Sequence, residues 1–117
     1  MSSCSESEPY ALQVLDDSME PEFPDRCVVV IDPFPECQDG AFVFAEYEGV
    51  RWFRQYQKRG EQHFLVPLNP IYPEFEMTGP FTVHGLIVQR NVRRKIKHYP
   101  MGLLPEDAEN EISARSV

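Results

Sequence analysis

The stretch from Ala11 to Asp32 reads ALQVLDDSMEPEFPDRCVVVID, and it predicts two strands joined by a polar connection. Ala11 to Leu15 and Cys27 to Ile31 are short apolar runs of strand length. Between them lies the polar elbow from Asp16 to Met19, followed by a segment with two prolines. Because both strands hold the elbow in place, we expect the hydroxyl of Ser18 to face a cleft. Ser18 is therefore the candidate reactive group.

A serine in a polar turn also has a purely structural interpretation. Serine is common in turns because its hydroxyl forms hydrogen bonds with nearby backbone groups. This role requires no reactive chemistry. The sequence that follows Ser18 has to decide between the two interpretations.

The length and composition indicate one mainly β domain. A chain of 117 residues with 42% hydrophobic content can bury a single core. Eleven prolines and six glycines, spaced by β-branched and aromatic residues, favour short strands joined by turns. No apolar run approaches the roughly 20 residues that a membrane-spanning helix needs, and the N-terminus lacks the basic charge of a signal peptide. We therefore expect a cytoplasmic protein that does not contact a membrane.

The net charge of −8 makes sequence-independent binding to nucleic acid phosphates unfavourable, so no direct DNA binding is expected. The three cysteines share no metal-ligand or redox spacing, and Cys27 in an apolar strand fits a reducing compartment. His63, His84 and His98 are widely separated. We therefore predict neither a metal site nor a cofactor.

Four further strands follow, each bounded by turn residues. They are predicted at Ala41 to Tyr47, Val50 to Gln57, His63 to Pro67 and Phe81 to Gln89. Glu48-Gly49 is a two-residue hairpin turn, Lys58 to Glu61 is a second turn, and Leu68 to Pro73, LNPIYP, is a proline-rich bend.

The two ends of the chain differ from this domain, which we place at residues 10–92. Residues 1–9 read as a flexible acidic arm, and residues 93–117 form a basic and then acidic extension. The basic strip from Arg90 to His98 is interpreted as a solvated strand edge or as a partner of acids on the same chain. The alternative is an anionic partner, such as the acidic tail of a second subunit.

Four features in fixed order carry a resemblance to a known family: SM after a strand, VVVIDP, DGAFVFAEYEGVRWFRQ, and the pair LVPLNPIYP and FTVHGLIVQR. Together they resemble the LexA/UmuD family, the serine-lysine self-cleaving peptidase domains of SOS repressors, phage repressors and mutagenesis proteins. The resemblance covers Tyr10 to Val92. It implies a LexA C-terminal-domain-like fold of small curled sheets and homodimerisation through C-terminal strands. It also implies a serine nucleophile at Ser18, with Asp17 and Met19 forming the elbow around it.

The family base is a lysine on the strand after the DG hairpin, and this chain departs from that pattern. Aligned without a gap, the lysine position falls on Arg54, and a shift of one residue would place it on Phe53. Proteins do not deprotonate arginine, so Arg54 cannot take the proton from Ser18. Lys58 is a substitute base only if the strand bends, because it lies four residues beyond Arg54, roughly 13 Å along a strand.

Further departures concern the substrate and the elbow. The family cleaves an Ala-Gly or Cys-Gly bond upstream of the serine, whereas residues 1–17 contain no glycine, so no substrate for cleavage in cis is expected. Asp16 stands where the family often has glycine, and Arg26-Cys27 replaces the GD of the usual DGD. Aspartate tolerates unusual φ values, so the elbow is expected to survive.

These departures favour a catalytically degenerate domain that acts by binding, as a homodimer. Its core and dimer seam are predicted to contain Phe23, Phe34, Trp52, Tyr56 and the strand from Phe81 to Val88. Arg54 is predicted either to bind a carboxylate in the former cleft or to pair with Asp16, Asp17 or Glu46.

Two alternatives for the function stay open. One is an active serine peptidase that cleaves another protein in trans through Ser18. The other is a mixed dimer with a related repressor, which would carry one DNA-binding domain instead of two. By analogy with UmuD, DNA-repair proteins are further candidate partners.

Overall fold

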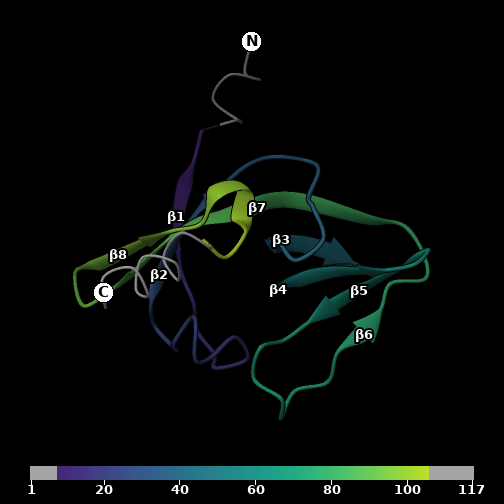
Figure 1. Cartoon of the computed structure of the whole chain (residues 1–117), viewed down its shortest axis with the longest axis horizontal. Coiled ribbons are helices and arrows are strands. Elements are labelled where there is room, and N and C mark those ends of the chain that lie inside the picture. The colour runs from purple at the N-terminus through teal and green to yellow at the C-terminus, as the bar shows by residue number, and fades with distance from the viewer. Residues whose placement is uncertain (1–7, 106–117) are drawn as a thin grey trace, which may run out of the picture.

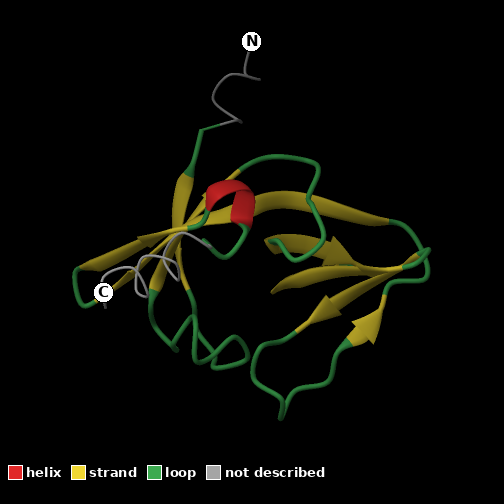
Figure 2. Ribbon diagram, viewed as in Figure 1, coloured by secondary structure: helices red, strands yellow, loops and turns green. Residues whose placement is uncertain are grey.

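The computed structural model describes residues 8–105, and it shows an antiparallel β domain (Figures 1 and 2). The elements are β1 (Tyr10–Gln13), β2 (Val28–Asp32), β3 (Phe42–Tyr47), β4 (Val50–Arg59), β5 (Gln62–Val66), β6 (Phe75–Glu76), β7 (Phe81–Val92), β8 (Lys95–His98) and the 3-10 turn η1 (Pro100–Gly102). The mainly β, single-domain prediction is confirmed.

The long strand β7 joins the two halves of the sheet (Figure 1). The strand order is β1-β2-β7-β3-β4-β5-β6, and β8 also pairs with β7. The first residues of β7 pair with β3, and its last residues pair with β2 and β8. Where several small sheets were expected, the strands therefore form one continuous sheet. Register shifts after Val30 and Phe44 bend it where the two halves meet.

Two clusters of buried side chains form the core. The first contains Val14, Met19, Phe23, Cys27, Val29, Ile31, Phe42, Ile87 and Tyr99, and the second contains Ala41, Val43, Ala45, Tyr56, Leu65, Met77, Val83 and Leu86. The rings of Phe23, Phe42 and Tyr99 contact one another with centroids 4.9 to 5.6 Å apart. The first cluster packs directly beneath the serine elbow, because Met19 belongs to it.

Several strand boundaries differ from the prediction. β1 ends at Gln13, and Leu15, expected in this strand, is 75% exposed. β4 continues to Arg59, so the following turn is confined to Gly60 and Glu61. The short strand β6 was not predicted, whereas β8 lies within the strip from Arg90 to His98 that was interpreted as a solvated strand edge. Phe34, predicted for the core and dimer seam, is 41% exposed in the single chain and belongs to neither buried cluster.

The packed part of the chain continues beyond Val92, where the predicted domain ends. β8 pairs with β7, and Tyr99 is fully buried against Phe23 and Phe42. The proposed arm lies mostly outside the described residues, as does most of the acidic part of the extension.

Within residues 8–105, no helix is long and apolar enough to span a bilayer, and no group of His, Cys, Asp or Glu side chains has an arrangement that could hold a metal ion. Burial raises the pKa of both described cysteine thiols, Cys27 and Cys37, to about 11. Both thiols are therefore protonated near neutral pH, so they are poor nucleophiles and poor metal ligands.

Candidate functional site

The serine elbow is a local turn closed by Asp16. Asp16 Oδ1 accepts a hydrogen bond from the backbone N–H of Ser18 at 3.2 Å and another from Ser18 Oγ at 3.0 Å. An aspartate that bonds to the backbone two residues on stabilises a tight turn. The sequence DDSM thus forms the predicted elbow without glycine.

Arg54 of β4 reaches the same hydroxyl from the opposite side. Its Nη1 donates to Ser18 Oγ at 2.9 Å and to the Phe53 carbonyl at 2.9 Å. The Arg54 side chain also lies over the ring of Trp52, with the guanidinium carbon 5.1 Å from the ring centroid. The Ser18 hydroxyl therefore donates to a carboxylate and accepts from a guanidinium.

Arg54 is buried, and this changes its electrostatics. The residue is 8% exposed, and its Nε is buried with no hydrogen-bond partner among the described residues. Burial lowers the pKa of Arg54 from its ordinary value, against the raising effect of the nearby charge of Asp16. Because a guanidinium stays protonated in proteins, Arg54 is a fixed cation beside Ser18.

The proline-rich bend after β5 holds the elbow in place. The backbone N–H of Asn69 donates to the Ser18 carbonyl at 3.0 Å, and Asn69 Nδ2 donates to the Asp17 carbonyl at 3.0 Å. Tyr72 Oη donates to Asp17 Oδ1, and this hydrogen bond raises the pKa of Tyr72. The sequence analysis predicted LNPIYP as a proline-rich bend and as a family motif. It did not identify Asn69 and Tyr72 as supports of the elbow.

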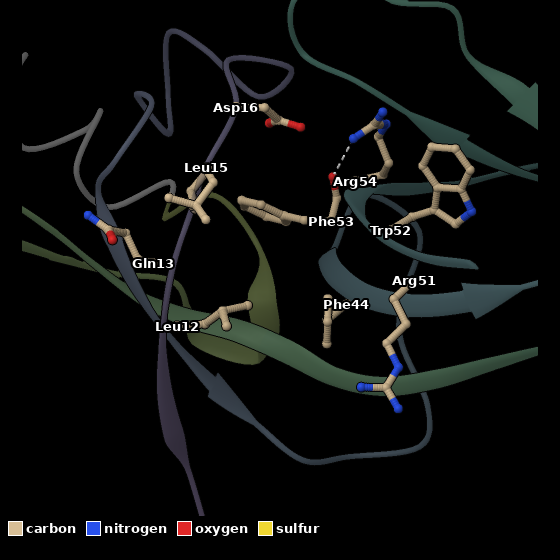
Figure 3. Close-up of a pocket in the computed structure, with 10 residues that line it drawn as sticks. Leu12, Gln13, Leu15, Asp16, Phe44, Arg51, Trp52, Phe53 and Arg54 are labelled. Carbon is tan, nitrogen blue, oxygen red and sulfur yellow. Dashed lines mark hydrogen bonds between the residues drawn. The ribbon is translucent and has the colours of Figure 1, made fainter. Parts of the chain in front are cut away.

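The hydroxyl of Ser18 was expected to face a cleft, but it is buried. Ser18 is 1% exposed and Met19 is fully buried. The accessible space is instead a neighbouring groove of about 290 Å³, lined in part by Asp16 and Arg54 (Figure 3). Ser18 itself does not line this groove, and its hydroxyl is hydrogen-bonded to both of these side chains.

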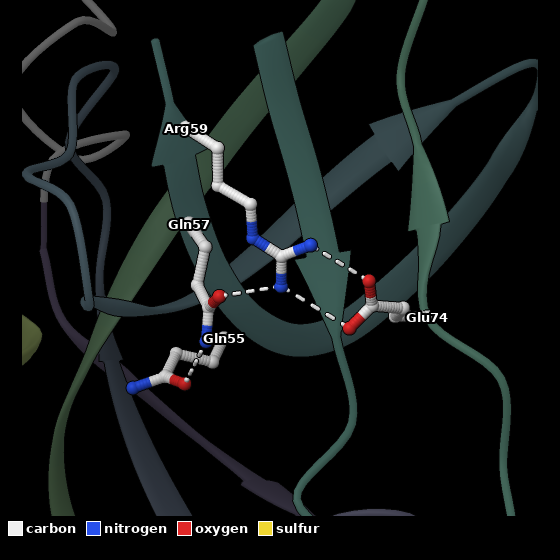
Figure 4. A network of polar contacts seen from close by, with 4 residues as sticks. All are labelled: Gln55, Gln57, Arg59 and Glu74. Carbon is white, nitrogen blue, oxygen red and sulfur yellow. Dashed lines mark hydrogen bonds and ion pairs between the residues drawn. The ribbon is translucent and has the colours of Figure 1, made fainter.

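The other predicted partners are elsewhere. Lys58 is exposed near the far end of β4, and its backbone N–H donates to Asp39 Oδ1 at 2.9 Å. Gln55, Gln57 and Arg59 of the same strand form a polar network with Glu74 (Figure 4). The structure thus brings Ser18 and Arg54 together, and leaves Lys58 outside their hydrogen-bonded cluster.

The predicted ion pairs of Arg54 with Asp16, Asp17 or Glu46 do not form among the described residues. Asp16 is connected to Arg54 only through the Ser18 hydroxyl, and Asp17 bonds to Tyr72. Glu46 lies 2.9 Å from His84 and 3.7 Å from Arg51. The guanidinium therefore keeps part of its donor capacity unused.

Arg26 shows how the elbow region tolerates a departure from the family pattern. It stands at the glycine position of DGD, and its φ of +77° lies in the left-handed region that favours glycine. Its backbone N–H donates to the Val14 carbonyl at 2.7 Å, which closes the loop between the two strands. The backbone geometry is thus kept although the residue type has changed.

The antiparallel β fold and the buried serine beside a basic side chain define a domain of the serine-peptidase type. The profile of the Peptidase S24-like family matches residues 2–88, and the chain belongs to this family. This confirms the resemblance drawn from the sequence motifs.

Curated relatives of the chain are regulators and repressors. It is 36% identical over 87 residues to the HTH-type transcriptional regulator for conjugative element R391 of Providencia rettgeri, covering 68% of this chain and 40% of the relative. It is 33% identical over 91 residues to repressor protein C2 of Salmonella phage P22, covering 73% of this chain and 42% of the relative. It is 37% identical over 80 residues to LexA repressor 2 of Pseudomonas syringae pv. tomato, covering 66% of this chain and 40% of the relative. The chain spans about 40% of the length of these relatives.

Proposed function

We propose that this chain is a regulatory domain of the S24 family that works by binding rather than by peptide cleavage. The observation that carries the proposal is the contact between Arg54 Nη1 and Ser18 Oγ at 2.9 Å. In a serine-lysine pair the base accepts the hydroxyl proton. Arg54 donates a hydrogen bond to this hydroxyl instead, and it has no acceptor of its own. Ser18 occupies the nucleophile position and Arg54 the position of the family lysine, so the site holds its serine without activating it.

The regulatory part of the proposal is supported by the relatives, which are named as repressors and transcriptional regulators. We infer that the domain acts in the same kind of pathway, such as SOS, phage-repressor or mutagenesis regulation. Its partner is a related repressor in a mixed dimer, or a DNA-repair protein. A cytoplasmic location belongs to the same proposal.

Homodimerisation is a further part of the proposal, and β8 supports it. Among the described residues β8 pairs only with β7, so its other edge has unpaired backbone groups. Ile96 on this strand is exposed. Sedimentation velocity tests the dimer: we expect about twice the 13.6 kDa mass of one chain. A single species at the monomer mass at high concentration would contradict it.

A second candidate function, peptide cleavage in trans, is favoured by one observation. Asp16 Oδ1 lies 3.0 Å from Ser18 Oγ and already accepts its proton in a hydrogen bond. A carboxylate in this position could act as the general base in place of lysine. The positive charge that prevents Arg54 from acting as a base would then stabilise the ionised carboxylate of Asp16.

A serine-directed fluorophosphonate distinguishes the two functions. The unmodified chain is incubated with the reagent from pH 6 to pH 10, and its intact mass is measured, with trypsin as the control for the reagent. We expect no adduct, because Ser18 is buried and no neighbouring base removes its proton. An adduct that disappears in Ser18→Ala would show an active nucleophile and overturn the proposal.

A further inference from the structure

We propose that the groove beside Arg54 binds the free carboxylate at the C-terminal end of an extended peptide. This inference rests on the proposed function, because it names the ligand class of a site that binds instead of cleaving. Its basis is the donor capacity of Arg54 that the protein leaves unused, together with the shape and lining of the groove.

A guanidinium carries five N–H groups, and the protein engages only part of them. Nη1 donates to Ser18 Oγ and to the Phe53 carbonyl. Nε is buried with no partner, and Nη2 makes no hydrogen bond to any residue in the described range 8–105. Nε is enclosed by the protein, so Nη2 is the nitrogen of Arg54 that is left for an acceptor from the groove.

A carboxylate matches this donor better than other anions do. Nη2 makes no hydrogen bond within residues 8–105, and a carboxylate oxygen can accept from it in a charge-assisted hydrogen bond. The charged lining residues of the groove are Arg51, Arg54 and Asp16, two positive and one negative. The negative charge of Asp16 favours a singly charged ligand over a doubly charged phosphate.

The rest of the lining fits the end of a peptide. Apolar side chains from three strands form the walls around Arg54 (Figure 3). They include Leu12, Phe44, Trp52 and Phe53. The volume of about 290 Å³ lies at the small end of the range for ligand pockets, ~300–1,000 Å³. The groove therefore has room for a chain end with an apolar side chain, and not for a folded partner.

The segment that lines one side of the groove can also orient a peptide. Leu12 to Leu15 line it, and among the described residues β1 pairs only with β2. Its outer edge thus has backbone groups free to pair with an extended segment. A peptide lying along this segment would place its last residue beside Arg54.

The carboxylate itself is tested with two peptides that differ only at their C-terminus. A fluorescein-labelled hexapeptide of alternating serine and leucine is prepared as the free acid and as the amide, and fluorescence anisotropy measures the binding of each. We expect the acid to bind at least about tenfold more tightly, because the amide lacks the charge that Arg54 recognises. In Arg54→Gln this preference should disappear.

Lys58→Gln is the matched control, because it removes an exposed cation from the same strand outside the groove and leaves the Ser18 contact in place. We expect it to keep most of the preference for the acid. Thermal unfolding establishes that each variant is folded. The comparison of acid and amide on the unmodified chain does not depend on any variant.

The outcomes separate this inference from the proposed function. Equal binding of acid and amide, binding of neither at millimolar concentration, or a preference that persists in folded Arg54→Gln would each overturn the carboxylate site and leave the binding function standing. Cleavage of either peptide, detected by mass spectrometry, would instead overturn the proposed function.

Discussion

Arg54 Nη1 and Ser18 Oγ lie 2.9 Å apart, although 36 positions separate the two residues in the chain. The contact joins the loop after β1 to the middle of β4, and the turn residue Asp16 completes it from the other side. The cation donates to the hydroxyl, and the carboxylate that accepts from it is part of the turn. This arrangement is the basis of the proposed binding function.

Arg54→Lys is predicted to make Ser18 reactive. A lysine buried at this position would have its pKa lowered by desolvation, so a fraction becomes neutral and can accept the serine proton. Lysine also lacks the guanidinium that covers the Ser18 hydroxyl, so the reagent can reach it. We expect fluorophosphonate labelling that is absent in the unmodified chain and that rises with pH as the lysine loses its proton. Intact mass at several pH values measures the labelling. Persistent labelling after Ser18→Ala is added to this variant would show that another residue reacts.

Asn69→Ala is predicted to loosen the elbow. The substitution removes the hydrogen bond from Asn69 Nδ2 to the Asp17 carbonyl and the one from the Ile71 N–H to Asn69 Oδ1. We expect the free energy of unfolding to fall by about 1–2 kcal/mol, since a partly buried carbonyl loses its donor. Urea unfolding measures this change.

Asn91→Ala is the control for this prediction. Asn91 is exposed in β7, and its side chain makes no hydrogen bond within residues 8–105. Its replacement should change stability by less than about 0.5 kcal/mol. If the two variants were equally stable, the bend would not hold the elbow.

The sequence predicted the parts of the fold that depend on local pattern. The apolar runs of β2, β3 and β7 and the Glu48-Gly49 hairpin are set by alternation and turn residues, and they appear close to the expected positions. The hairpin between β7 and β8 was missed because its turn consists of Arg93 and Arg94 at φ values of 51° and 71°. Such angles favour glycine or asparagine, so the usual signal for the turn is absent.

The candidate site was predictable only in part for a similar reason. The family register placed Arg54 near Ser18, but neither periodicity nor charge could show that Asn69 and Tyr72 support the elbow. Neither could they show the burial of the Ser18 hydroxyl, which was expected to face a cleft. It depends on how Asp16 and Arg54 close over the hydroxyl, which is a tertiary effect.

Gly85→Ala is predicted to destabilise the junction between the two halves of the sheet. A Cβ at Gly85 would lie 2.5 Å from Ile31 Cγ2 and 2.8 Å from the Asp32 carbonyl oxygen. The backbone of β2 would have to move, so we expect a loss of about 2–3 kcal/mol in the free energy of unfolding, measured by urea unfolding. Gly79→Ala is the control, because a Cβ there meets nothing within 4 Å. Equal stability of both variants would mean that the strands can separate at this point.

Glu22 joins the proline-rich connection before β2 to the last elements of the chain. Its Oε2 accepts hydrogen bonds from Lys97 Nζ at 2.7 Å and from Tyr99 Oη, and lies 3.5 Å from Arg90 Nη1. Burial alone would raise the pKa of Glu22, but the hydrogen bonds from Lys97 and Tyr99 and the charges of Lys97 and Arg90 outweigh it and lower the pKa. The ionised carboxylate therefore stabilises the folded state.

Glu22→Gln is predicted to remove a pH-dependent part of the stability. Because the folded pKa lies below the unfolded value, this stabilisation is complete above the unfolded pKa of about 4.3 and is lost as the pH falls through the folded pKa. We expect the variant to be less stable by about 2 kcal/mol at pH 7 and nearly equal to the unmodified chain at about pH 2, measured by urea unfolding across this range. Glu74→Gln, which breaks the exposed pair with Arg59, should have a much smaller effect at either pH. A constant difference between Glu22→Gln and the unmodified chain at all pH values would show that ionisation of Glu22 is not the source of the stabilisation.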